Sequence, residues 1–162
     1  IFIMLYMVYH SAAEAAHVLL AVPFALSGGV FLQKLLGYNF NGAVWVGYIA
    51  LFGVAVQTGV VMVVYLQEAL DTRLRDDHEL NEPGLLDAVM AGAVLRLRPK
   101  LMTVLATLCG LLPILWSSGV GADVLKPIAA PIAGGMITSA LHVLIITPVI
   151  FFMMKKRVLL KA

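Results

Sequence analysis

Charged side chains are scarce in this sequence. Asp, Glu, Lys and Arg make up only 12% of its 162 residues, whereas an ordinary soluble domain carries about a quarter. Apolar residues make up 62%, and the mean hydropathy is +0.99. A soluble domain of about 150 residues still leaves roughly a third of its chain surface in water, and a chain with so few polar residues cannot cover that surface. The composition excludes a soluble globular enzyme and indicates a membrane protein.

Several chemical signatures are also absent. The single cysteine, Cys109, lies in an apolar stretch and rules out a disulfide-bonded scaffold. The sequence contains no HExxH, GxSxG, P-loop or CxxC motif, so we expect no enzymatic activity, no cofactor and no bound metal. The net charge of +2, from 11 basic and 9 acidic residues, is too balanced to indicate nucleic-acid binding.

Long apolar runs define the membrane segments. A helix needs about 20 apolar residues to cross the ~30 Å hydrocarbon core, and we place spans at residues 15–36, 43–67, 100–118 and 127–154. Residues 1–13 reach only about 20 Å, so we interpret them as the inner part of a truncated span. The start Ile-Phe-Ile has no initiator Met, so we infer that the chain was cut from a longer one. The predicted fold is an all-α membrane protein, a bundle of about five transmembrane helices with the first truncated.

One polar segment, residues 68–99, separates the central spans. Together with the flanking Gln67 and Lys100 it holds 12 of the chain's 20 charged residues. We expect a turn at Pro83–Gly84 and then an amphipathic helix, because apolar residues recur at helical spacing from Leu85 to Leu97. This short helix is predicted to lie along the cytoplasmic face and to lead into the span at 100–118.

The basic residues predict the orientation of the spans. If segment 68–99 is cytoplasmic, nine basic residues lie inside and only Lys34 and Lys126 lie outside. The nine are Arg73, Arg75, Arg96, Arg98, Lys100, Lys155, Lys156, Arg157 and Lys161. We therefore predict that segment 68–99 and the C-terminal tail face the cytoplasm, and that residue 1 points outward.

Polar residues inside spans are the best candidates for function, because each is costly in lipid unless it is paired or hydrated. Gln57 lies mid-span, where it either makes an interhelical hydrogen bond or lines a polar conduit. Lys100 and Thr103 share one helical face with Thr107. Either Lys100 snorkels to the interface above threonines that bond to their own backbone, or this face lines a hydrated path. His142 is expected to be a structural residue whose ring nitrogens have hydrogen-bond partners.

Small residues four positions apart indicate sites of close helix packing. The pairs are Ala55 and Gly59, Ala130 and Gly134, and Gly135 and Ser139. We expect these positions to face neighbouring helices.

Two stretches of the sequence resemble a known family of transporters. They are VPFALSGGVFLQKLLGYNFNGAVWVGYIALFGVAVQTGVVMVVYLQEA and GAVLRLRPKLMTVLATLCGLLPILWSSGVGADVLKPIAAPIAGGMITS. Both resemble the resistance-nodulation-cell division (RND) pumps, and within them the heavy-metal efflux branch that exports copper and silver or cobalt, zinc and cadmium. The resemblance covers nearly the whole chain, and RLRPKLMT and IAAPIAGGMITS are its most specific parts.

The resemblance implies an architecture and a set of partners. A pump of this family has twelve spans and two large periplasmic insertions, and works as a homotrimer in the bacterial inner membrane with a periplasmic adaptor and an outer-membrane channel. Residues 1–162 would then be the C-terminal transmembrane domain, from the end of span eight through span twelve. Its immediate partners would be the lipid bilayer and the remainder of the pump chain. Segment 68–99 resembles the cytoplasmic helix between spans ten and eleven.

The resemblance also implies a proton relay. Family members drive export with protons that pass charged residues between spans four, ten and eleven. Gln57 matches the span-ten position, where metal pumps often have Glu, and Lys100 and Thr103 match span-eleven relay positions. Gln does not change its protonation near neutral pH, and Leu125 stands where metal pumps have a methionine. The span-four carboxylates and the periplasmic metal site lie outside this chain.

The functional prediction is therefore the C-terminal transmembrane part of a proton-driven efflux transporter that exports heavy-metal cations. Two alternatives remain open at this point. One is an RND exporter of multidrug or other organic substrates, and the other is a membrane structural subunit with no transport of its own.

Overall fold

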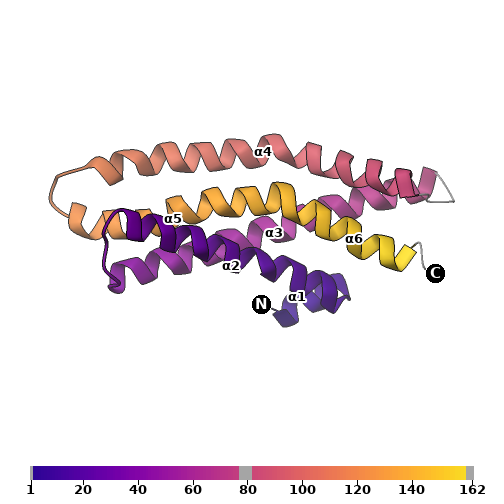
Figure 1. The fold of residues 1–162 in the computed structure, drawn as a ribbon, viewed down its shortest axis with the longest axis horizontal. Helices are drawn as coiled ribbons and strands as arrows, with labels where there is room; N and C mark the ends of the chain where they lie inside the picture. The colour runs from indigo at the N-terminus through magenta and orange to yellow at the C-terminus, as the bar shows by residue number, and fades with distance from the viewer. Residues whose placement is uncertain (1, 77–81, 160–162) are drawn as a thin grey trace.

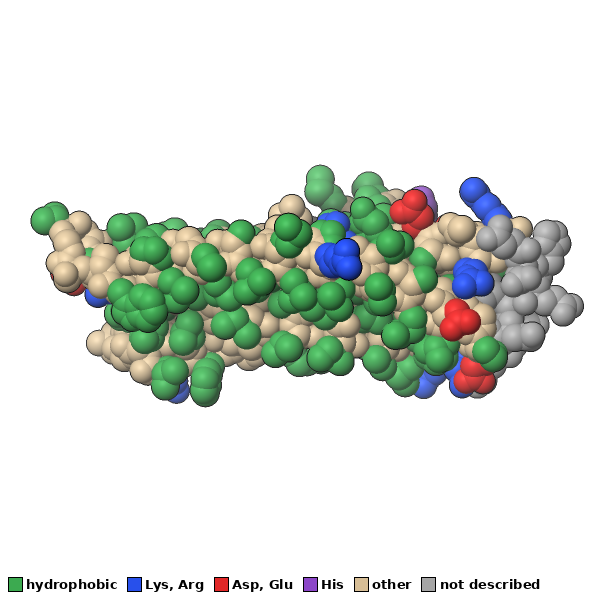
Figure 2. All heavy atoms as spheres, turned by 90° about the horizontal axis from the view of Figure 1, so that it is seen from above, with side chains coloured by type: hydrophobic (Ala, Val, Ile, Leu, Met, Phe, Trp, Pro, Cys, Tyr) green, Lys and Arg blue, Asp and Glu red, His purple; other side chains and the backbone are tan. Residues whose placement is uncertain are grey.

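The computed structural model describes residues 2–76 and 82–159, and every regular element among them is helical. The elements are α1 (Phe2–Tyr9), α2 (Ala12–Leu35), α3 (Gly42–Asp76), α4 (Glu82–Trp116), α5 (Ala122–Leu141), the π-helical segment η1 (His142–Ile146) and α6 (Thr147–Leu159). The long helices lie side by side in an elongated bundle (Figure 1). Apolar side chains cover most of the face seen in Figure 2, and most of its charged side chains gather towards one end.

Four of the described helical stretches are long and apolar enough to cross a membrane. They are Ala12–Leu35, Gly42–Arg75, Glu82–Trp116 and Ala122–Val158. The prediction of an all-helical membrane bundle is confirmed at this level. The expected fifth span corresponds to α1, which is a helix of only eight residues and is too short to cross a bilayer by itself.

The amphipathic segment differs from the prediction. No separate short helix follows the expected turn, because Pro83 and Gly84 lie in the first turn of α4, which continues unbroken to Trp116. Proline is favoured in the first helical turn, since the N–H that it lacks has no intrahelical partner there. Only part of the predicted apolar stripe packs on α3. Leu85 and Val89 are buried and share one core cluster with Leu66 and Leu70 of α3, whereas Leu86, Met90, Val94 and Leu97 are exposed.

The centre of the bundle is the antiparallel contact between α2 and α5, which Figure 1 shows side by side. The helices approach closely because small residues face each other. A Cβ atom on Gly135 would lie 2.7 Å from the carbonyl oxygen of Ala25, and one on Gly134 would lie 2.6 Å from Leu32 Cβ and would also meet the backbone of Gly28. Without side chains at these positions the two backbones come into direct contact.

The last long helix contains a local change of hydrogen-bonding pattern. The backbone N–H of Thr147 donates to the carbonyl of His142, five residues earlier, so residues 142–146 form one π-helical turn. Pro148 follows directly and has no N–H to donate, which breaks the regular α-helical ladder at this point. α5, η1 and α6 nevertheless remain one continuous path across the bundle (Figure 1).

The orientation of the bundle can be tested with cysteines at Asn39, between α2 and α3, and at Arg75, near the end of α3. Both residues are exposed, and Cys109, which is also exposed, is first replaced by Ala. A membrane-impermeant thiol reagent should reach Arg75→Cys only from the cytoplasmic side and Asn39→Cys only from the opposite side. The reason is that this orientation places nine of the eleven basic residues on the cytoplasmic side. Labelling of both positions from one side would contradict the orientation.

The close contact between α2 and α5 can be tested with matched glycine substitutions. Gly134→Ala should destabilise the chain by about 1–3 kcal/mol, because the new methyl group must displace Gly28 or Leu32. Gly53→Ala is the control, since a Cβ there meets nothing within 4 Å and alanine favours the helix. The measurement is thermal unfolding followed by circular dichroism in detergent. Equal midpoints for the two variants would mean that the contact does not limit stability.

Candidate functional site

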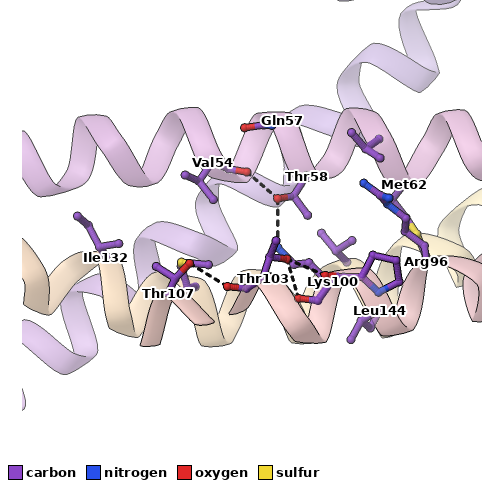
Figure 3. A pocket seen from close by; sticks show the side chains of 14 residues that line it. Val54, Gln57, Thr58, Met62, Arg96, Lys100, Thr103, Thr107, Ile132 and Leu144 are labelled. Carbon is purple, nitrogen blue, oxygen red and sulfur yellow. Dashed lines mark hydrogen bonds between the residues drawn. The ribbon is translucent and has the colours of Figure 1, made fainter. Parts of the chain in front are cut away.

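A cavity of about 440 Å³ lies between α3 and α4 and contains the three residues predicted as relay candidates. Gln57 lines it from α3, and Lys100 and Thr103 line it from α4 (Figure 3). The floor is apolar and comes from the helix formed by α5 and η1, which contributes Ile132 and Met136 among others. The structure therefore brings Gln57 together with Lys100 and Thr103, which lie more than 40 positions later in the sequence.

Lys100 is the best-anchored side chain of the cavity. Only 7% of the residue is exposed, and its Nζ donates a hydrogen bond to Thr58 Oγ1 at 3.1 Å. The Thr58 hydroxyl donates in turn to the carbonyl of Val54 at 2.7 Å, so its lone pairs remain available to the lysine. Lys100 thus extends across the cavity to α3 (Figure 3) and does not snorkel along its own helix.

Thr103 lies one turn further along α4, and its side chain is exposed. Its hydroxyl donates to the carbonyls of Pro99 and Lys100, both at 2.9 Å. Thr107 makes the same kind of bond to the carbonyl of Thr103 at 2.8 Å. The threonines therefore bond to their own backbone, as one of the two sequence interpretations expected, while their oxygens can still accept a hydrogen bond from water.

Gln57 is exposed on α3 and makes no hydrogen bond to any residue that the structure describes. An interhelical hydrogen bond within this part of the chain was one of its two expected roles, and the described residues do not supply it. Its amide points away from the contact between Lys100 and Thr58 in Figure 3. Gln57 is therefore free to meet a neighbouring helix or water at the mouth of the cavity.

The predicted small residues lie in the packed interior. Ala55, Ala130, Gly134 and Gly135 are buried, and Gly59 is buried against the backbone of Val18 on α2. They hold α2, α3 and α5 together beside the cavity.

The sequence analysis missed two partners of this site. Thr58 accepts the lysine hydrogen bond, and the only signal for it was its position next to Gln57. Arg96 also lines the cavity, with its guanidinium 4.8 Å from the ring centroid of Tyr65. It lies one helical turn before Lys100, a spacing that places two cations on the same face of α4.

No carboxylate faces Lys100 among the side chains that the structure describes, which belong to residues 2–75 and 82–158. The two ion pairs in this part of the chain join Lys155 to Glu14 and Lys156 to Glu82. The lysine ammonium carries three N–H donors, and the described residues provide one acceptor, Thr58. A buried charge is stable only when it is paired or hydrated. The Lys100 ammonium therefore requires a further partner, and the cavity has room for an acidic side chain or water.

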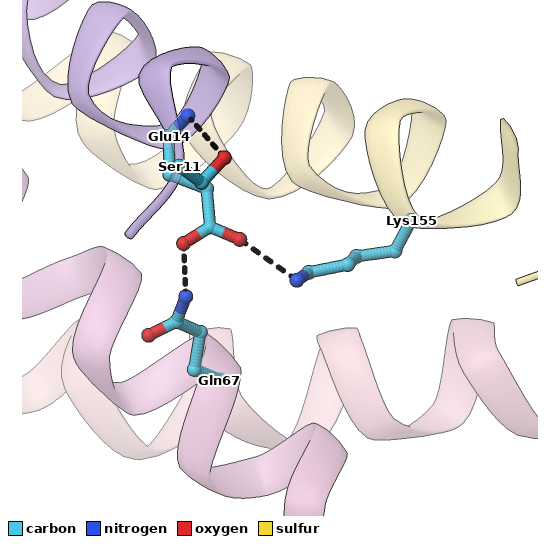
Figure 4. Close-up of polar contacts among 4 residues, drawn as sticks. All are labelled: Ser11, Glu14, Gln67 and Lys155. Carbon is cyan, nitrogen blue, oxygen red and sulfur yellow. Dashed lines mark hydrogen bonds and ion pairs between the residues drawn. The ribbon is translucent and has the colours of Figure 1, made fainter. Parts of the chain in front are cut away.

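A second polar cluster is built around a buried carboxylate at the start of α2. Glu14 is only 5% exposed, and its Oε1 accepts from Lys155 Nζ at 2.7 Å while its other oxygen accepts from Gln67 Nε2 (Figure 4). Ser11 Oγ caps α2 by accepting from the backbone N–H of Glu14 at 3.4 Å. The spacing S-x-x-E is a helix-start signal, and it could have located the cap but not the distant lysine.

The model of the AcrB/AcrD/AcrF family matches residues 1–155. The chain is 44% identical over 156 residues to the cation efflux system protein CusA of Escherichia coli (strain K12), which covers 95% of this chain and 15% of that protein. It is 34% identical over 152 residues to the cobalt-zinc-cadmium resistance protein CzcA of Cupriavidus metallidurans, covering 93% of this chain and 13% of that protein.

A solved structure shows the same arrangement of helices. The crystal structure of a heavy metal efflux pump superposes with a TM-score of 0.79 at 34% identity, over 96% of this chain and 15% of that one. The chain thus spans about 15% of the length of the relatives that it matches. The family match across residues 1–155 and the similarity to metal exporters show that the chain belongs to the AcrB/AcrD/AcrF (RND) family, among its heavy-metal efflux pumps.

Proposed function

We propose that residues 1–162 are the C-terminal transmembrane part of a proton-driven RND transporter that exports heavy-metal cations. The names of the similar proteins support the substrate class, since they are a cation efflux system protein and a cobalt-zinc-cadmium resistance protein. In this proposal the chain contributes one wall of the proton pathway. The carboxylates that complete the pathway belong to the remainder of the pump.

The observation that carries the proposal is the state of Lys100. Its ammonium is buried, faces a cavity, and has a hydroxyl but no carboxylate as partner among the described residues. An acidic side chain that enters the cavity from another helix of the pump would pair with it strongly, because attraction between charges grows as water is excluded. Protonation of that acid would cancel the attraction and return the lysine to Thr58. The cavity can therefore exist in two arrangements that differ by one proton.

The other candidate residues have supporting roles in this mechanism. Gln57 cannot carry a proton near neutral pH, so it serves as a hydrogen-bond partner for the incoming acid or for water. Thr103 offers a hydroxyl oxygen one turn beyond Lys100, where it can hold water in line with the ammonium. The relay is complete only when both are joined by an acid from outside this chain.

The exposed apolar faces support the proposed partners. α4 carries exposed Met102, Leu105 and Trp116 on its outer side, and this surface suits the lipid bilayer or the remaining helices of the pump. We place the complete transporter in the bacterial inner membrane as a homotrimer with a periplasmic adaptor and an outer-membrane channel. These assignments rest on the family relationship.

The role of Lys100 can be tested in a complete pump that contains this chain. Lys100→Met should abolish efflux while the protein still inserts and assembles, because the cavity loses the buried ammonium that pairs with the acid. Thr103→Val should lower efflux about five- to tenfold, which corresponds to the loss of one hydrogen bond of about 1 kcal/mol. The measurement is metal efflux per assembled pump.

Matched controls separate this mechanism from general damage. Lys34→Met removes an exposed lysine near the end of α2, and Thr72→Val removes an exposed threonine that bonds to its own backbone at 2.8 Å. Both should leave the turnover unchanged. Normal turnover per assembled pump in Lys100→Met would end the relay proposal.

A second test uses the chain by itself. Reconstituted into vesicles with an imposed pH gradient, residues 1–162 should show no metal-linked or proton-linked flux, because the acid that completes the relay is missing. Flux is followed with a metal-sensitive dye and a pH-sensitive dye inside the vesicles. Flux that rises in proportion to the amount of protein would overturn the interpretation as a partial pump.

A further inference from the structure

Two buried histidines lie in the bundle away from the Lys100 cavity. His17 on α2 is 4% exposed, and His142 at the start of η1 is 1% exposed. None of their four ring nitrogens has a hydrogen-bond partner in the described part of the chain. His142 is thus not the satisfied structural residue that the sequence predicted. A buried polar group without a partner is costly, so two such rings at one place call for a physical explanation.

The packing of α2 against α5 brings the two rings to the same level of the bundle. The helices run antiparallel, and Gly28 lies against the carbonyl of Gly134. Because the helices are antiparallel, going eight residues back from Gly28 and eight residues forward from Gly134 leads to the same level of the bundle. These steps end at residue 20 of α2 and at His142. His17 is three residues from position 20, so the two histidines differ by about 5 Å along the helix axes. Phe24 of α2 stacks on the His142 ring with the centroids 4.5 Å apart, which confirms that this ring faces α2.

The backbone at His142 is also unusual. The π-helical turn begins at this residue, and its carbonyl accepts the hydrogen bond from Thr147 that widens the turn. Single π-helical turns occur frequently at functional sites, because they shift the side chains that follow and leave backbone groups less regularly bonded. At His142, a buried ring without a hydrogen-bond partner among the described residues therefore coincides with the start of the π-helical turn.

Charged groups approach the histidine pair from one side. Glu14 lies one turn before His17 on the same face of α2. Lys155 of α6 neutralises Glu14 through their ion pair. The other helices bring only neutral groups: α1 brings the Tyr9 hydroxyl, which donates to Val60 at 3.0 Å, and α3 brings the amide of Gln67.

We propose that His17 and His142 together form a second proton-binding site of the membrane domain, and that the ion pair between Lys155 and Glu14 controls its occupancy. A neutral imidazole has one N–H donor and one nitrogen lone pair. The bound proton comes from water and forms a bond to the free lone pair of one ring, and the resulting cation is shared with the other ring directly or through a water molecule.

The control follows from Coulomb's law. While Lys155 holds Glu14, the carboxylate charge is compensated and the histidine pair binds its proton only at lower pH. When α6 moves and the ion pair opens, the uncompensated carboxylate stabilises a proton one turn away. The site does not depend on Lys100 or on the proposed export activity, so its titration tests it independently of the proposed function.

The titration can be observed directly, because the chain has only four histidines. With His10→Asn and His78→Gln as background, the ring nitrogens of His17 and His142 are labelled with ¹⁵N, and the 162-residue chain is placed in phosphatidylcholine vesicles. Between about pH 8 and pH 5, nitrogen NMR should show one imidazolium per chain. His17→Gln or His142→Gln should move the uptake to lower pH by about one unit. Circular dichroism is used to check that each variant is folded.

The ion pair provides the decisive comparison. Lys155→Met should move the uptake to higher pH by about one unit, because Glu14 is left uncompensated, whereas Glu14→Gln should move it to lower pH. Both variants break the same contact, so a general loosening of the bundle would move them in one direction. Lys156→Met is the matched control, since Lys156 pairs with the exposed Glu82 and should leave the uptake unchanged.

Three results would overturn the proposal. The first is that both rings stay neutral throughout the range, and the second is that each ring binds its own proton independently. The third is that Ag⁺ or Zn²⁺ added at neutral pH shifts the signals of both rings, which would make the pair a metal site and not a proton site.

Discussion

The contact between α2 and α5 is the packing constraint on which the rest of this structure depends. The two backbones touch because glycines at positions 28, 134 and 135 leave no side chains between them. α3 then packs across this pair through a core that includes Val44, Leu51 and Ala55, and α4 packs against α3, α5 and α6. Lipid gives helices little hydrophobic reason to associate, so close van der Waals contact of this kind is the main source of order in the bundle.

The position of α4 on the outside explains why the cavity exists. α4 packs on one side only and leaves most of its surface uncovered. The polar face of its membrane-crossing half turns towards α3, where Thr58 provides an acceptor for Lys100. The result is a polar site in which, among the described side chains, no carboxylate faces Lys100.

The polar groups of the bundle are divided between two places. Lys100 and Arg96 belong to the cavity between α3 and α4, whereas Glu14, Lys155 and the two histidines belong to the interface of α2 with η1 and α6. Apolar packing around Val143 and Met62 lies between them. Because a dry medium of low dielectric constant screens charges only weakly, a charge change at one place still acts on the other through this packing.

The sequence by itself determined that the chain crosses a membrane, where its four long spans lie, and which residues form the polar face of α4, because these depend on composition and helical periodicity. It also carried enough specific sequence for the family to be recognised. It did not determine that α4 begins at Glu82 and runs through Pro99 as one helix, since a periodic apolar stripe looks the same whether it meets a membrane surface or α3. Nor did it pair Lys100 with Thr58, Lys155 with Glu14 or His17 with His142. Those pairs join helices distant in sequence, and only tertiary packing decides which faces meet.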